Sequence, residues 1–331
     1  MNAANDQMKG FEGDRLFLGQ NPAPGATLAY RLKSDAKDVK LTIKDASGAT
    51  VRELSGTPST PPGASPSTSP GASPSTSLGT SPSTSLGASD LRDRNKTGLN
   101  VVKWDLRVQP LRPLPPPPGA PAGGPAAGGG GFGGGGNNGP YVLPGTYRVT
   151  LIVNGRDAQT MDVAVKGDPL IQITDTERRT WHETSRDLHA LQQKANDVAE
   201  MVQNAFAQVQ LLQQQTRNQT VAPNVKQQLD NVVKEFEVVR RRLGLGQQGG
   251  GGGFGGNTDN LRGRIGQLKG QVMQSTAPPT NTQMMQVRDV RAQLPGLIDQ
   301  ANAVVAKVPA LVKDLVGSGT LFPVIKPIPK G

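Results

Sequence analysis

The apolar residues of this chain change their spacing near residue 174, and this change divides the sequence into two kinds of structure. Before it, apolar residues alternate with polar ones, the period-two pattern of half-buried β-strands. After it, they recur at steps of three and four, the pattern of helices that pack through a heptad seam. Since 331 residues suffice for two ordinary domains, we expect an α+β protein with a strand half and a helical half.

The strand half is expected to be an antiparallel, immunoglobulin-like β-sandwich, because short strands and turns alternate without a helical pattern between them. Asp45–Gly48 predicts a hairpin turn, and Asn154-Gly155 suits a two-residue type I′ turn. Arg15–Leu18 is a candidate for a seventh strand. The six clear strands cover residues 28–32, 39–43, 50–54, 102–106, 147–153 and 161–165.

Two low-complexity insertions interrupt the strand half. An eight-residue Gly/Ser/Thr/Pro repeat at 63–89 forms most of an insertion at 57–95, and a proline run with a glycine tract forms a second at 109–139. Neither composition buries enough apolar surface to order itself, so both are expected to be disordered loops. For the repeat, neutral expansion and a glycosylated or partner-binding stalk stay open as alternatives.

The helical half begins at a capping box, in which Thr174 and Glu177 satisfy the first free amides of a helix expected from about residue 175 to 215. Three more apolar seams supply the partners that so long a helix needs. They cover residues 225–243, 261–272 and 290–315.

Prolines and glycines punctuate these seams. Pro223 suits a first helical turn, whereas Pro295 and Pro309 predict kinks or breaks. The glycine-rich loop at 247–257 separates two seams that together approach the first helix in length. We therefore expect an antiparallel bundle of three legs, the second of them interrupted, with a four-helix bundle as the alternative. The expected domains are a tail at 1–14, the sandwich at 15–168, the bundle at 169–316 and a tail at 317–331.

The residue types that most active sites need are scarce. The chain has no cysteine, which excludes disulfides and thiolate sites, and only two histidines. His182 and His189 lie seven residues apart, about 10 Å along a helix, too far to share one ion. We expect both to pack beside the seam, and we assign no catalytic, cofactor-binding or metal-binding residue.

The net charge of +10 raises the question of polyanion binding. The charge is diffuse, however, and the residues of its one basic run, Arg240–Arg242, point in different directions on a helix. With 12 aromatic residues in the chain, this argues against nucleic-acid binding. No segment approaches the roughly 18 apolar residues of a membrane helix, and Met1–Asp6 does not begin a signal peptide, so no membrane insertion is expected.

Short motifs follow one another along the strand half in a specific order. They are Asn21-Pro22 with Gly25–Tyr30, Val39–Asp45, Gly48 with Val51–Leu54, Gly98–Arg107, Pro144–Val149 and Asp168-Pro169. This series resembles the FlgD-like immunoglobulin module near the C-terminus of large exported bacterial proteins, where a helical segment follows the Asp-Pro. Those proteins carry sortilin-type or BNR/Asp-box β-propellers and are often labelled glycosyl hydrolase or sialidase-like.

The resemblance implies an extracellular or periplasmic location, while the lack of a signal peptide in this chain leaves a cytoplasmic location open. No Ser-x-Asp-x-Gly-x-Thr-Trp Asp-box occurs in this chain, so the propeller that would hold a glycosidase site is absent from it. The matching residues have structural roles: Trp104 fills the space between sheets, and glycines 98, 145 and 155 serve turns. Asp105 and Arg107 are expected to pair across strands or to face solvent.

Three functions follow from these observations. The favoured one is a non-catalytic structural or accessory module that supports or spaces a β-propeller domain or protein. One alternative is a glycosyl hydrolase (sialidase-like) fragment, with Asp157, Asp162 and Asp168 as candidate carboxylates. The other is a basic protein that binds a polyanion or a cell surface. An incomplete heptad seam also leaves helix-mediated self-association open.

Overall fold

The computed structural model describes residues 25–55, 94–115, 136–169, 171–217, 222–245, 260–275 and 277–317. Within these ranges the protein is α+β, with antiparallel sheets of six strands and with five helices, as the change of period predicts. The candidate strand at Arg15–Leu18, most of both insertions, the loop at 247–257 and the two tails lie outside the described residues. The chain divides into two compact units, Met1–Val39 with Ser55–Leu106 and Lys40–Leu54 with Arg107–Gly331.

The first unit contains a two-stranded antiparallel sheet. β1 (Ala26–Leu32) pairs with β4 (Gly98–Trp104) along its whole length. One face of the pair is buried and carries the apolar residues that the period-two pattern selects. These are Leu28, Tyr30, Leu32, Val102 and Trp104, and the indole of Trp104 is fully buried.

The strand predicted at 102–106 ends earlier than expected. β4 stops at Trp104, and Leu106 has a φ of 57°. This left-handed conformation takes the chain out of the extended path, and a leucine rarely adopts it. The expectation that Leu106 continues the alternation is therefore wrong.

The second sheet has four strands in the order β3-β2-β5-β6. Their bounds are β2 (Val39–Lys44), β3 (Thr50–Ser55), β5 (Gly145–Val153) and β6 (Arg156–Val165). Both predicted turns are confirmed: the Asp45 carboxylate accepts hydrogen bonds from the amides of Ser47 and Ala49, and Asn154 and Gly155 have the two positive φ values that a type I′ turn requires.

β6 is confirmed as a strand, but its apolar residues are not buried as those of β5 are. Tyr147 and Val149 of β5 lie in the interior, whereas their partners Val163 and Met161 on β6 are half-buried and exposed, Met161 at 57%. Because β6 is the last strand in the sheet order, its alternation alone does not decide whether a covering layer reaches it.

The helices are α2 (Asp175–Arg217), α3 (Pro223–Arg242), α4 (Leu261–Gln274), α5 (Asn281–Val305) and α6 (Lys307–Gly317). The capping box is confirmed, since the amide of Glu177 donates to the Thr174 hydroxyl (3.2 Å) and the amide of Thr174 donates to the Glu177 carboxylate (3.0 Å). Pro223 occupies the first turn of α3, where its missing N–H costs nothing.

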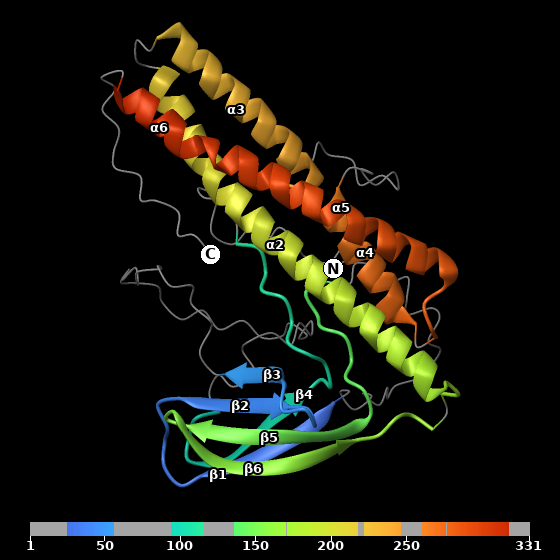
Figure 1. Cartoon of the computed structure of the whole chain (residues 1–331). Helices are drawn as coiled ribbons and strands as arrows, with labels where there is room; N and C mark the ends of the chain where they lie inside the picture. The colour runs from blue at the N-terminus through green and yellow to red at the C-terminus, as the bar shows by residue number, and fades with distance from the viewer. Residues whose placement is uncertain are drawn as a thin grey trace, which may run out of the picture. The chain divides into compact units, whose positions relative to one another are not determined.

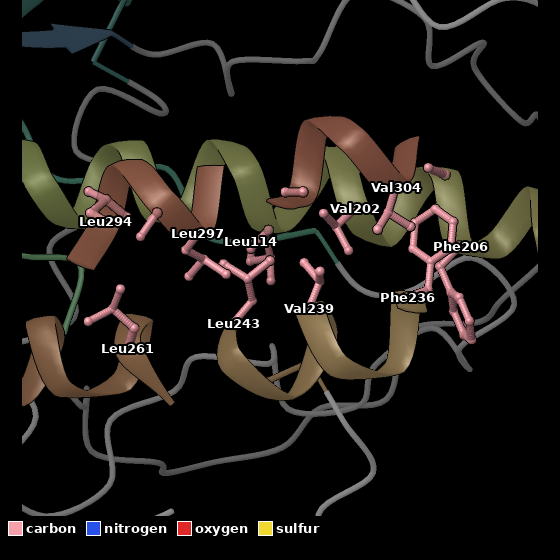
Figure 2. Packing of buried hydrophobic residues seen from close by; sticks show 14 of the residues in the cluster. Leu114, Val202, Phe206, Phe236, Val239, Leu243, Leu261, Leu294, Leu297 and Val304 are labelled. Atoms are coloured by element: carbon pink, nitrogen blue, oxygen red, sulfur yellow. The ribbon is translucent and has the colours of Figure 1, made fainter. Parts of the chain in front are cut away.

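The five helices share one hydrophobic core. α2 contacts all four others, and in Figure 1 α5 and α6 continue one another beside it. The seam residues predicted from the sequence point into this core, where Val202 and Phe206 of α2 meet side chains of α3 and α5 (Figure 2). A heptad seam is thus the source of the packing.

The expected interruptions have identifiable causes. The end of α3 lies beside the start of α4, where the Arg262 guanidinium donates to the carbonyl of Leu243 (2.6 Å). α5 continues through Pro295 but ends at Val305, four residues before Pro309. A proline ring collides with the carbonyl four residues earlier, so the break falls where Pro309 predicts it.

Candidate functional site

Two short segments pair with each other before the chain enters the helices. The amide of Val108 donates to the carbonyl of Pro140 (3.0 Å), and the amide of Leu111 donates to that of Asn137 (2.7 Å). We call residues 107–111 and 136–141 the ribbon. Part of it lies in the insertion expected at 109–139, so the described ends of that insertion are hydrogen-bonded structure rather than disordered loop.

One side of the ribbon covers the edge of β3. The amide of Gln109 donates to the carbonyl of Val51 (2.8 Å), and the side-chain oxygen of Gln109 accepts from the amide of Glu53 (2.9 Å). The Arg52 guanidinium donates to the carbonyl of Val108 (3.2 Å). These bonds satisfy strand groups that would otherwise face outward at a sheet edge.

Arg107 and Gly139 hold the two halves of the ribbon together. The Arg107 guanidinium lies 3.7 Å from the centre of the Tyr141 ring and donates to the carbonyl of Gly139 (2.9 Å). This matches the expectation that Arg107 pairs across strands. A Cβ atom at position 139 would lie 2.4 Å from the Val108 carbonyl oxygen, so only glycine fits this close approach.

The other side of the ribbon binds a lysine that is completely buried. Nζ of Lys269, on α4, donates to the carbonyls of Gly136 (2.9 Å) and Asn138 (3.0 Å) and lies 3.5 Å from Nδ1 of His189, on α2. Nε2 of His189 lies 2.9 Å from the carbonyl of Gln109. Lysine and histidine thus bind three backbone carbonyls of the ribbon.

This geometry assigns the protons of the pair. The Gln109 carbonyl can only accept, so Nε2 of His189 carries the hydrogen, and Nδ1 is left to accept from Lys269. Burial, with smaller effects from neighbouring cations, lowers the pKa of His189 to about 4 and that of Lys269 to about 7. The imidazole is therefore neutral at pH 7.

His182 repeats the arrangement seven residues earlier on α2. Its Nδ1 lies 2.9 Å from the carbonyl of Tyr141, and burial lowers its pKa as well. The expectation that both histidines pack beside the seam is confirmed, and each also contacts the ribbon. Lys269 is the residue that sequence reasoning missed. A signal was present, since position 269 lies four residues after Ile265 and three before Val272, on the buried face of α4.

The cluster of Lys269 and His189 has the properties of a structural anchor for the ribbon. All three protons of the Lys269 ammonium have acceptors within reach, and the side chain has no exposed surface. A nucleophile or general base must reach a substrate, and this amine reaches the ribbon backbone instead. What the arrangement can do is hold the ribbon against α2 and α4.

The structure does not bring the candidate carboxylates together. Asp157 pairs with Ile152 of β5 and Asp162 with Arg148, and a register shift between Leu151 and Ile152 leaves both aspartates on one face of the sheet. Their partners are four residues apart, about 13 Å along the strand, which exceeds the separation of a glycosidase pair. Asp162 forms an ion pair with Arg148 (3.2 Å), and Asp168 lies exposed after the strand.

The basic run on α3 is also engaged within the chain. The Arg240 guanidinium lies 3.9 Å from the centre of the Phe206 ring and pairs with Glu237, and Arg242 donates to Gln300. Within the described ranges, no group of three or more histidine, aspartate or glutamate side chains is placed to hold a metal ion. In that same part of the chain, no helix is long and apolar enough to cross a membrane.

Comparison of the chain with family models, curated proteins and solved structures finds no match. The resemblance to the FlgD-like module accordingly stays a prediction from the motifs.

Proposed function

We propose that this chain is a non-catalytic structural or accessory module of an exported propeller-type protein, acting outside the cytoplasm. In this proposal an immunoglobulin-like β-sandwich and an antiparallel helical bundle support or space a β-propeller domain or partner. The observation that carries it is Lys269: this fully buried lysine donates its hydrogen bonds to the chain's own backbone carbonyls. These buried hydrogen bonds stabilise the fold of the chain itself.

The arrangement of elements supports a spacing role. α2 alone has 43 residues, which corresponds to a rod of about 65 Å. Helices on several sides of α2 bury its seam, so bending it would expose apolar surface. The ribbon adds hydrogen bonds that tie α2 and α4 to the chain next to β3.

A distance measurement between spin labels tests the spacer. The chain has no cysteine, so Arg179→Cys and Gln214→Cys give one exposed label near each end of α2 without a background to remove. A rigid helix predicts one narrow distance distribution centred near about 53 Å, plus the reach of the labels. A broad distribution would contradict a spacing function.

The same preparation tests the enzymatic alternative. We expect no hydrolysis of a panel of 4-methylumbelliferyl glycosides, a sialoside included. Hydrolysis that disappears in Asp162→Asn would overturn the proposal in favour of a glycosidase. The exposed ion pair of Asp162 with Arg148 has little structural weight, so a loss of hydrolysis in this variant would point to a catalytic carboxylate.

A further inference from the structure

The groups that act on the buried pair are almost all cationic. Arg107 on the ribbon lowers the proton affinity of Lys269, while Arg186 on α2 and Lys269 itself lower that of His189. Acids on the same or packed elements form ion pairs of their own: Asp187 on α2 pairs with Arg291, Asp289 on α5 with Arg264, and Glu53 on β3 with Lys40. Among the described residues, the charges that act on the pair are cations, so a second positive charge there would meet only repulsion from them.

We propose that the Lys269–His189 pair makes the ribbon an acid-released strap: protonation of His189 beside the Lys269 ammonium detaches residues 107–111 and 136–141 from α2 and α4. This inference does not depend on the proposed accessory function. It concerns how the chain between sheet and helices responds to pH, whatever the module supports.

The step is a simple change of donors and acceptors. The neutral imidazole accepts from Lys269 through Nδ1 and donates to Gln109 through Nε2. An imidazolium has two donors and no acceptor, so Nδ1–H then faces the ammonium at 3.5 Å. Two unscreened positive charges at this distance repel strongly when buried. Release of the ribbon lets water reach both groups.

The direction of the pH effect follows from linkage. A histidine with a pKa of about 4 while the strap is docked, and of about 6.5 when it is free, binds more protons in the released state. The contribution of His189 to docking is therefore complete above pH 6.5 and is lost as the pH falls toward 4, by up to about 300-fold in the docking equilibrium. Lys269, with a pKa of about 7, keeps its charge over this range. The lowered pKa of Lys269 acts at higher pH, between 10.5 and about 7.

Spin labels report the release directly. Asn138→Cys places one label on an exposed ribbon position and Gln271→Cys a second on the exposed side of α4. At pH 7.5 we expect one short, narrow distance. Between pH 6.5 and 4 its population should give way to a broad distribution, while helical circular dichroism at 222 nm stays constant.

Two variants decide which group is responsible. His189→Gln keeps an N–H donor for Gln109 but cannot become charged, so the short distance should persist at pH 4. His182→Gln is the matched control, in which release should still occur. If His189→Gln does not fold, Lys269→Met removes the repelling ammonium instead. The population of the short label distance should then no longer change between pH 6.5 and 4.

The inference is overturned if the wild-type label pair keeps its short distance at pH 4, or if His189→Gln releases the ribbon as the wild type does. Loss of helical signal with the same midpoint as the distance change would also contradict it, because the strap would then have no transition of its own.

Discussion

Replacement of Phe236 by alanine tests the packing of α3 on α2. The ring of Phe236 is completely buried and lies 5.7 Å, centre to centre, from that of Phe206, at a tilt of 51° (Figure 2). The guanidinium of Arg240 also lies over the ring of Phe206, 3.9 Å from its centre. Removing the Phe236 ring therefore leaves a cavity and takes away the aromatic partner of Phe206.

The expected loss follows from these contacts. Truncation of a buried phenylalanine to alanine costs about 3–5 kcal/mol in transfer free energy and cavity formation. A tilted aromatic pair contributes about 0.5–1.5 kcal/mol beyond buried area, which places this site in the upper half of that range, at about 4–5 kcal/mol. Phe236→Leu keeps most of the volume and should cost less than half as much.

Urea denaturation followed at 222 nm measures these differences, since most of the described helix lies in this core. Val238→Ala is the matched control, because Val238 lies on the same helix and is 53% exposed. It should change the free energy of unfolding by no more than about 0.5 kcal/mol. If Phe236→Ala and Val238→Ala unfold at the same urea concentration, α3 does not pack on α2 through this ring.

Two further predictions concern backbone and capping. Gly139→Ala should destabilise the protein by about 1–3 kcal/mol, because its methyl group would meet the Val108 carbonyl, whereas Gly145→Ala, with open space around it, should be neutral in the same thermal melts. Thr280→Ala removes the side chain that caps α5 and should lower the free energy of unfolding by about 1 kcal/mol, with Thr280→Ser restoring it; equal stability of the three proteins would refute the capping argument.

Much of the helical core could be predicted because a seam needs only sequence spacing. Leu188, Ala195, Val202 and Val209 repeat at steps of seven, and all four are fully buried. The start of α2 could also be predicted, since a capping box is a local motif that four consecutive residues specify. Neither the seam nor the capping box depends on residues far away in the sequence.

Features that depend on distant partners could not be predicted in the same way. A lysine between seam residues is ordinarily a solvated side chain, and Lys269 is buried because ribbon carbonyls more than 130 residues earlier accept its protons. The exposure of Met161 is also set by its position in the sheet order, which alternation along β6 does not encode. The ribbon itself lies at the ends of a segment whose composition indicates loop.

The anchoring of Pro115 and Gly136 has a practical consequence. The Gln203 amide holds the carbonyl of Pro115 (3.0 Å), and Lys269 holds that of Gly136 (2.9 Å), so the chain leaves and rejoins the helices at two attached points. Doubling the length between such points costs only about 0.6 kcal/mol of closure entropy. An affinity tag or a reporter domain genetically inserted there would leave the neighbouring packing intact, which makes this junction a convenient handle for purification and labelling.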